Sequence, residues 1–241
     1  MHLNEGSQIG SASFATPDLF IAEDKLRKRF GQPRHGNKRE PVAELLYILL
    51  SLQTSETNCK RSYSALRRAF SRFSQLATAR VSSIRKPIAF AGLGTQRAKK
   101  ISTIVRRIKS DFGRVSLASL RQMPTADAEK YLTSLPGVGK KTARCVLMYS
   151  FGRAVFPLDT HCARILKRLG FEIPGGSLRR CEDKIQYAVP EPVRYSLHVT
   201  MISLGRTICT SINPGCDRCP LLDMCPTGRR RMNLTPQEHV A

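Results

Sequence analysis

Four cysteines near the C-terminal end are spaced closely enough to share one metal centre. Cys209, Cys216, Cys219 and Cys225 follow the pattern C-x6-C-x2-C-x5-C. Two disulfide bridges are the alternative, but no secretory signal is evident, and in a reducing compartment such thiolates bind metal. Zinc sites usually bring two close pairs of ligands, and only Cys216 and Cys219 form such a pair. The spacing suits an iron–sulfur cluster equally well or better, with zinc as the alternative.

The other four cysteines are isolated and are interpreted as reduced core or helix residues: Cys59, Cys145, Cys162 and Cys181. A second chemical feature is the segment L-P-G-V-G-K-K-T, residues 135–142. Its two glycines permit a turn that aims backbone N–H groups of the next helix at a phosphate. An ordinary helix connection is the alternative, and the Walker pattern is not met.

Positive charge crowds the start of the helix that follows this turn. Lys140, Lys141 and Arg144 lie where the helix dipole disfavours cations. Natural helices tend to avoid this arrangement unless an anion binds there or a lysine is meant to lose its proton. Further along, Asp159 precedes Thr160 and His161, and taken alone it is interpreted as a helix N-cap.

The elements that must position these residues are expected to be helices. Residues 101, 104, 105 and 108 are apolar at helical spacing, and residues 41–52, 128–134, 142–149 and 159–169 also indicate helices. Loops are short and carry Gly or Pro, and no stretch alternates with period two. We therefore predict an all-α fold, with residues 1–16 and 229–241 as tails.

The overall charge points to a polyanionic partner. The chain has 241 residues, with 40 Lys and Arg against 18 Asp and Glu, a net charge of +22. Seven basic clusters are spread along the sequence, which indicates a folded surface that neutralises phosphates. No apolar run approaches the roughly 20 residues that a membrane span needs. We expect a protein of the cytoplasm and nucleoid, or of a nucleus, that is not secreted.

Three motifs in order resemble one family. L-P-G-V-G-K-K-T-A, then P-L-D-T-H, then the four cysteines are similar to the helix-hairpin-helix DNA glycosylases of the endonuclease III group. The resemblance runs from about residue 38 to 226. It implies two α-helical domains flanking a DNA cleft, with a 4Fe–4S cluster bound by the four cysteines. The expected boundaries are 17–38 with 154–228 for the cluster domain, and 39–153 for the domain that ends in the hairpin.

The resemblance also implies roles for individual residues. Lys141 holds the position of the nucleophile that attacks C1′ of a flipped nucleotide, and Asp159 that of the catalytic carboxylate. Lys140, the helix N-terminus and burial are expected to depress the pKa of Lys141. Gln53 and Leu93 match residues that fill the gap left by the extruded base. The remaining expected DNA contacts are Gly137, Val138, Gly139, Lys140 and Arg144.

The sequence departs from the family pattern at one loop. Residues 210–215 lack the basic side chains that touch DNA in many relatives. Residues 154–160 and 195–209 also resemble the plant 5-methylcytosine glycosylases. We expect a monomeric glycosylase with lyase activity on duplex DNA. Oxidised pyrimidines are the first expected substrate, and mismatched thymine or uracil and 5-methylcytosine are alternatives. A non-catalytic protein that binds damaged DNA is the rival from another class.

Overall fold

Several of the helices begin where a side chain accepts the first free amides. In the computed structural model, which describes residues 18–32, 36–173 and 178–234, Asp18, Ser55 and Asp159 each cap a helix in this way. The helices of the first half are α1 (Leu19–Phe30), α2 (Pro41–Ser51), α3 (Glu56–Ala69), α4 (Ser74–Thr78), α5 (Val81–Arg85) and α6 (Gly94–Phe112).

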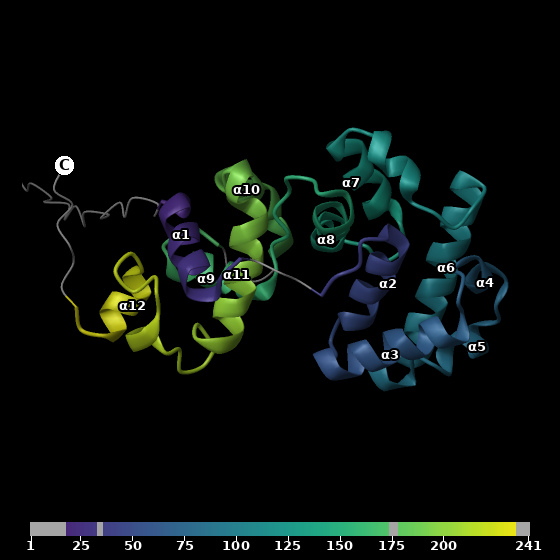
Figure 1. Ribbon diagram of the computed structural model, residues 1–241, viewed down its shortest axis with the longest axis horizontal. Helices are drawn as coiled ribbons and strands as arrows, with labels where there is room; N and C mark the ends of the chain where they lie inside the picture. The colour runs from purple at the N-terminus through teal and green to yellow at the C-terminus, as the bar shows by residue number, and fades with distance from the viewer. Residues whose placement is uncertain (1–17, 33–35, 174–177, 235–241) are drawn as a thin grey trace, which may run out of the picture.

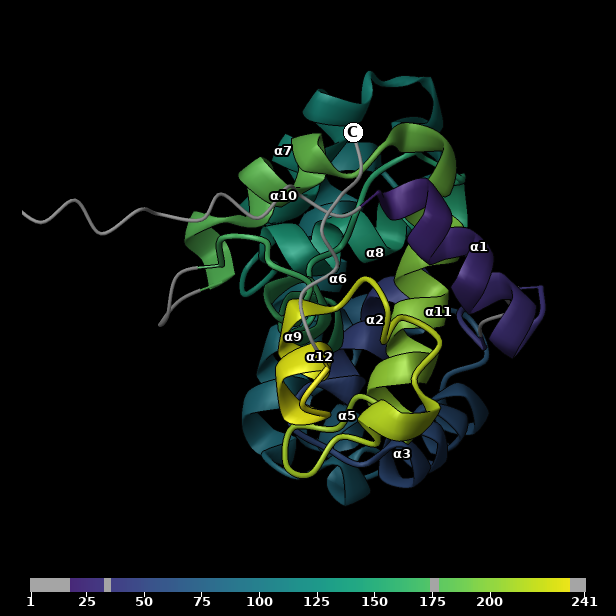
Figure 2. The ribbon, with the colours of Figure 1, turned by 90° about the vertical axis from the view of Figure 1, so that its left-hand side faces the viewer.

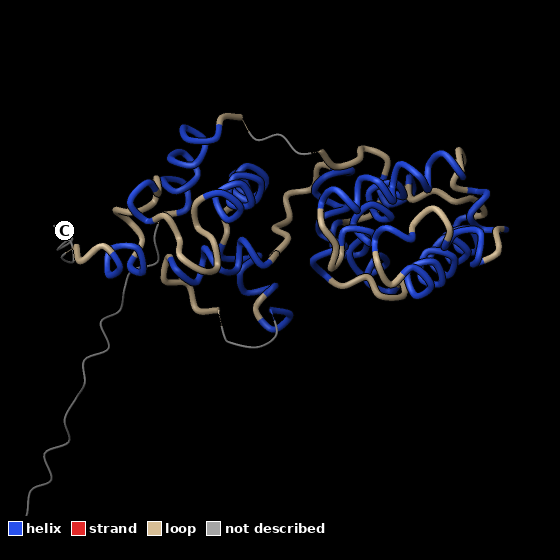
Figure 3. The backbone as a smooth tube through the Cα atoms, turned by 90° about the horizontal axis from the view of Figure 1, so that it is seen from below, coloured by secondary structure: helices blue, strands red, loops and turns tan. Residues whose placement is uncertain are grey.

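The second half continues with helices joined by short turns. They are α7 (Thr125–Ser134), α8 (Lys140–Phe151), α9 (Thr160–Arg168), α10 (Glu182–Ala188), α11 (Arg194–Thr207) and α12 (Pro226–Arg231). Short 3-10 turns also occur along the described chain, among them η1 (Ala89–Ala91) between α5 and α6. Figure 3 shows helices and loops and no strand in the described part of the chain. The all-α prediction is confirmed.

Two separate apolar cores hold these helices together. The first gathers buried side chains between residues 42 and 155, and α2 lies against α3, α6 and α8 within it. The second joins α1 to residues 156–221, and α1 packs against α11 although the two are far apart in the sequence. Figure 1 shows the two groups of helices as two lobes, and Figure 2, turned by 90° so that the second lobe faces the viewer, shows α1 beside α11.

The chain crosses between the lobes twice, after α1 and again after α8 (Figure 1). Lys141 at the start of α8 therefore belongs to the first core, while Asp159 at the start of α9 belongs to the second. The domain boundaries expected from the sequence stay a prediction, for which the change of core between Val155 and Phe156 supplies a rationale.

The expected tails have different outcomes. The last turn of α12 is formed by Arg229, Arg230 and Arg231, which were expected to begin a tail. This helix starts at Pro226, and Cys225 caps it because Cys225 Sγ accepts a hydrogen bond from Gly228 N–H. Residues 1–16 and 235–241 lie outside the described residues.

Candidate functional site

The turn between α7 and α8 has the geometry of a hairpin with an open helix start. Val138 N–H donates to the Leu135 carbonyl at 3.1 Å, and Gly137 has a φ of +73° that favours glycine. Gly139 is the extended N-cap of α8, and no side chain caps this helix. The first amides of α8 are thus left for a ligand. The Val138 side chain is buried, and its N–H donates within the turn. Neither group is therefore available for the DNA contact expected of Val138.

Lys100 of α6 lies directly against this turn. A Cβ on Gly137 would lie 2.7 Å from both Cε and Nζ of Lys100, so the turn needs glycine for packing as well as for conformation. The ammonium of Lys100 is therefore beside the hairpin although 37 residues separate them. No sequence motif singles out Lys100, because α6 carries several lysines and arginines.

Lys141 is half-buried on the first turn of α8. Cys145, followed by Asp159, Cys162 and Glu44, raises the pKa of Lys141 above its usual value and outweighs burial, which lowers it. This contradicts the expected depression of that pKa. The helix start and Lys140 would lower the pKa of Lys141, but the carboxyl groups of Glu44 on α2 and of Asp159 at the start of α9 raise it. The local sequence does not reveal these two neighbours.

The neighbours of Lys141 differ in charge at neutral pH. Burial raises the pKa of Cys145 to about 11, so its thiol is uncharged at neutral pH and opposes loss of the Lys141 proton only at the alkaline pH where both groups titrate. Glu44 is fully buried and accepts hydrogen bonds from Lys38 N–H at 2.6 Å and from Asn37 Nδ2, while burial raises its pKa. Of the two carboxyl groups around Lys141, Asp159 contributes more than Glu44 to raising the pKa of the ammonium.

Asp159 caps α9 and also faces the catalytic candidate. Its Oδ1 accepts from Cys162 N–H at 2.7 Å. Burial raises the pKa of this carboxyl, but His198, the Cys162 amide and Lys141 together hold it below its usual value. The structure brings Lys141 and Asp159 from different lobes into one electrostatic pair. A protonatable amine beside an ionised carboxylate is suited to nucleophilic attack with a local proton acceptor.

A buried histidine supports this pair and was missed by sequence reasoning. His198 of α11 is 1% exposed, and its Nδ1 lies 3.5 Å from Cys162 Sγ. Its ring also packs edge-on against Phe156, with centroids 5.7 Å apart. The sequence around His198 gave no signal, because a histidine that only packs in a core and one that also faces a catalytic carboxylate have the same sequence context.

Arg144 is not a surface residue. Its side chain is 4% exposed, and it makes a two-pronged ion pair with Glu129 of α7 at 2.9 and 3.1 Å. It also bonds Asp183 Oδ1 at 2.6 Å and the Glu182 carbonyl at 2.8 Å, both at the start of α10. Three partners inside the protein occupy the guanidinium of Arg144, which argues against its expected DNA contact. Lys140 is ion-paired with Asp183 and is partly exposed.

Gln53 and Leu93 lie on one pocket although 40 residues separate them. Both side chains are exposed, and the pocket has a volume of about 340 Å³. Both residues have a positive φ, 50° and 48°, which non-glycine residues rarely adopt. Their neighbours in the lining are Leu49, Leu52, Gln96, Arg97 and Lys100. The structure thus brings the two expected wedge residues and Lys100 to one surface.

The four cysteines of the C-terminal motif converge on one small cavity. Cys209, Cys216, Cys219 and Cys225 all line it. Arg168 donates from Nη1 to Cys209 Sγ at 3.0 Å, and Gly228 N–H donates to Cys225 Sγ at 3.3 Å. Such donors stabilise thiolates, so the donor set fits a thiolate-bound cluster.

Among the described residues, no group of three or more His, Cys, Asp and Glu side chains has the arrangement expected around a metal ion. No helix in the same part of the chain combines the length and apolar character needed to cross a membrane.

Comparison with known proteins agrees with these motifs. The model of a family described as the HhH-GPD superfamily of base excision DNA repair proteins matches residues 46–189. The chain is 30% identical over 207 residues to Endonuclease III of Thermotoga maritima, covering 86% of this chain and 92% of that protein. It is 32% identical over 155 residues to DEMETER-like protein 2 of Arabidopsis thaliana, covering 56% of this chain and 11% of that protein.

A solved structure of a trapped Endonuclease III–DNA covalent intermediate superposes with a TM-score of 0.75 at 27% identity, covering 89% of this chain and 97% of that one. The chain spans most of the bacterial relative but only 57% of another Arabidopsis relative and about a tenth of DEMETER-like protein 2.

Proposed function

Because the chain belongs to the HhH-GPD superfamily of base excision DNA repair proteins, and within it to the glycosylases of endonuclease III type, we propose that it is a bifunctional DNA glycosylase and AP lyase. It removes a damaged base from duplex DNA and then cleaves the strand at the abasic site. One observation carries the lyase assignment, a half-buried lysine at an uncapped helix start that faces an ionised aspartate.

Access to the target bond requires that the nucleotide leave the duplex. The hairpin amides at Gly139 and Lys140 bind a backbone phosphate, assisted by the positive end of α8. Gln53 and Leu93 enter the gap that the flipped nucleotide leaves. Their exposure on one pocket supports this role, since two side chains on one surface are needed to replace a base in the stack.

The chemical steps follow from the Lys141–Asp159 pair. Asp159 accepts a proton from the Lys141 ammonium and passes it to the departing base, while Nζ forms a bond to C1′ and the glycosidic bond breaks. The ionised Asp159 stabilises the positive charge that develops on the sugar. The ring then opens to an imine between Lys141 and C1′. Loss of a C2′ proton expels the 3′ phosphate and completes β-elimination.

Trapping the imine tests this function. Borohydride added to the protein and an abasic duplex should yield a covalent adduct, and Lys141→Ala should abolish it. Lys140→Ala is the matched control, because it removes the adjacent lysine and should retain the adduct. A wild-type protein that gives no adduct leaves the rival function of non-catalytic damage binding, whereas an undiminished adduct with Lys141→Ala would show that another amine, and not Lys141, is the nucleophile.

The four converging cysteines support a 4Fe–4S cluster bound in the second lobe. Cys209, Cys216, Cys219 and Cys225 would be its ligands, and when bound the cluster would serve as a structural cross-link of the loop they share. Purified protein should be brown and contain iron and sulfide, and Cys219→Ser should lose the visible absorbance. Colourless protein with stoichiometric zinc would reverse the assignment.

Oxidised pyrimidines are the substrate class we propose first. The endonuclease III likeness over most of both chains supports this order. Single-lesion duplexes that carry an oxidised pyrimidine, a mismatched thymine or uracil, or 5-methylcytosine would rank these substrates by excision rate. We propose that the protein acts as a monomer on chromosomal DNA, in the nucleoid or the nucleus.

A further inference from the structure

Arg97 of α6 joins the two loops that carry the proposed wedge residues. Its Nε donates to the Gly92 carbonyl at 2.9 Å, and its Nη1 donates to the Leu49 and Leu50 carbonyls at 2.6 and 3.0 Å. Its Nη2 donates to the Leu52 carbonyl. The acceptors at Leu49, Leu50 and Leu52 are carbonyls at the C-terminal end of α2, so this guanidinium caps α2 and holds the turn before α6 at the same time.

This arginine is buried, and its partners are backbone atoms. Its exposed fraction is 8%, and burial lowers its pKa without removing the charge. Carbonyl dipoles that stabilise a buried cation must be held in place, since losing one leaves charge unsatisfied. The contact therefore constrains both loops, and not only the arginine.

Both loops hold a strained residue at the surface. Gln53 follows the bonded Leu52, and Leu93 follows the bonded Gly92, and each has a φ near +50°. Such conformations persist only where surrounding structure over-determines them. A guanidinium that bonds the residue before each of them supplies that constraint.

We propose that Arg97 is the positioning residue that keeps Gln53 and Leu93 in register for insertion into duplex DNA. This rests on the proposed function. Insertion of two side chains from separate loops succeeds only if both loops hold their spacing before DNA arrives, because ordering them afterwards costs conformational entropy.

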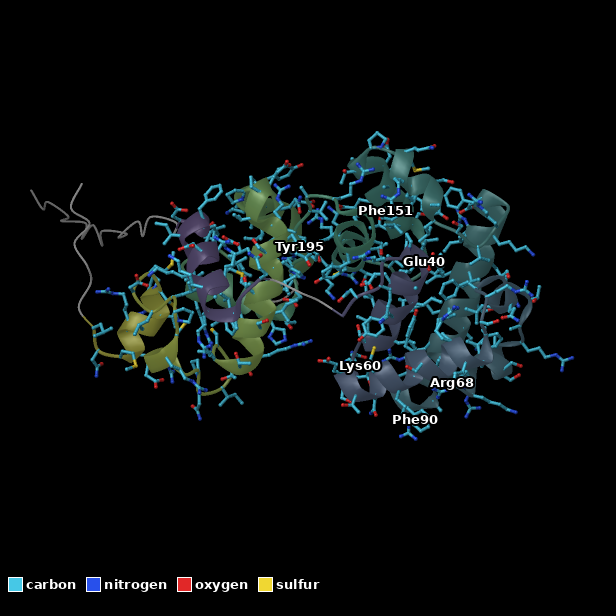
Figure 4. The ribbon with its side chains drawn as sticks, viewed as in Figure 1. Glu40, Lys60, Arg68, Phe90, Phe151 and Tyr195 are labelled. Carbon is cyan, nitrogen blue, oxygen red and sulfur yellow. The ribbon has the colours of Figure 1, made fainter. Side chains whose placement is uncertain are left out.

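A second contact holds the same turn from its other side. The guanidinium carbon of Arg61 on α3 lies 3.5 Å from the centroid of the Phe90 ring, and Phe90 belongs to η1. Figure 4 shows Phe90 at the edge of the first lobe beside α3. Phe90→Ala thus offers a milder way to loosen the turn that carries Leu93, with Arg97 left intact.

Arg97→Lys is the informative variant, because lysine keeps the charge but cannot bond two loops with one planar group. Arg106→Lys is the matched control. Arg106 lies on the same helix and donates to the Ala77 and Ala79 carbonyls at 3.0 and 3.3 Å, away from the pocket. The borohydride adduct rate is measured on an abasic duplex and on the same abasic strand alone.

We expect Arg97→Lys to lower the duplex rate about tenfold or more and to leave the single-strand rate within about twofold of wild type. Phe90→Ala should shift the same ratio less, and Arg106→Lys should not shift it. On a duplex whose opposite strand is unpaired around the abasic site, the adduct rate of Arg97→Lys should return toward that of wild type. Extrusion of the nucleotide then needs no wedge residue. Equal losses on both substrates, or no loss, would overturn the proposal.

A binding measurement that involves no bond cleavage tests this proposal independently of the proposed function. Fluorescence of 2-aminopurine beside a non-cleavable tetrahydrofuran site reports extrusion on binding. If wild type forms no adduct, the lyase assignment fails, while Arg97→Lys must still reduce the fluorescence rise and Arg106→Lys must not. If Arg97→Lys matches wild type in fluorescence, Arg97 has no positioning role even where the adduct forms. Urea unfolding of each variant measures its stability and establishes that all variants are folded under the assay conditions.

Discussion

The ammonium of Lys141 and the carboxylate of Asp159 stabilise each other's charged form. The pKa of Lys141 is raised and that of Asp159 is lowered, so at pH 7 the free protein holds a protonated amine beside an ionised acid. Attack on C1′ requires the neutral amine. In the proposed function the pair is therefore a resting state, and the nucleophile is the fraction of the protein in which Lys141 has lost this proton.

This pairing predicts a pH dependence of imine formation. Since the neutral fraction of Lys141 grows as pH rises toward a raised pKa, the adduct rate on an abasic duplex should climb about tenfold per unit between pH 6 and 9. Asp159→Asn keeps an N-cap for α9 but removes the negative charge. It should shift the rise to lower pH on abasic DNA, and excision of a damaged base should fall about 10²-fold.

Single-turnover rates at several pH values measure both effects. A wild-type rate that is level below pH 8 would show that the lysine pKa is depressed and would contradict the ion pair. Unchanged excision in Asp159→Asn would remove the carboxylate from the chemistry. Glu182→Gln serves as a control, because that carboxylate lies near Lys140 and Arg144 and is not among the principal charges around Lys141.

At the residue scale the sequence identified Lys141 and Asp159 as a pair but not the direction of their pKa shifts. Lys140 and the helix dipole are local and visible in the sequence, whereas Glu44, Cys162 and His198 come from other helices. The internal partners of Arg144 were not foreseen for the same reason, because Glu129 and Asp183 meet it only in the folded chain. Positive φ at Gln53 and Leu93 had no sequence signal, since neither is Gly or Asn.

At the scale of elements, ion pairs hold α8 to its neighbours on one side, while no side chain caps the backbone amides of its first turn. Arg144 ties α8 to α7 and to the start of α10, while Lys140 meets the same Asp183 at the surface. Helix positions followed readily from apolar periodicity, as for α2, α6 and α8. The last helix did not, because α12 is short and half of its residues are arginine, a composition that also suits a solvated tail.

Arg144→Met should destabilise the protein by about 3 kcal/mol, because it strands Glu129 and two acceptors at α10. Lys140→Ala should cost less than about 1 kcal/mol, since its pair with Asp183 is partly exposed. Urea unfolding measures both. If the opposite order is found, the α7–α8–α10 contact is not a main support of the fold.

The same two variants separate a structural arginine from a DNA-binding lysine. The salt dependence of DNA binding should lose about one phosphate contact in Lys140→Ala and none in Arg144→Met. A reduced slope in Arg144→Met would instead restore the DNA role expected from the sequence. Measurements at low temperature keep the weaker variant folded.

At the scale of the whole molecule, the net charge of +22 is carried by a helical surface and not by one tail. Part of it is already neutralised, as Arg206 of the second lobe pairs with Glu56 of the first at 3.2 Å and Lys25 pairs with Asp223. The composition foretold a polyanionic partner, but the pairs inside the protein depend on both lobes and had to be seen in the fold.

The unpaired remainder should govern binding to undamaged duplex. With about 6 to 10 phosphate contacts, affinity should fall about 10³–10⁵-fold between 50 and 200 mM salt. The adduct rate at saturating protein should change far less, because Lys141 and Asp159 are shielded from bulk ions. Fluorescence anisotropy at several salt concentrations, beside trapping rates in the same buffers, tests the two together. A shallow slope would mean that the basic surface serves solubility, and equal salt effects on rate and affinity would place the reacting pair in open solvent.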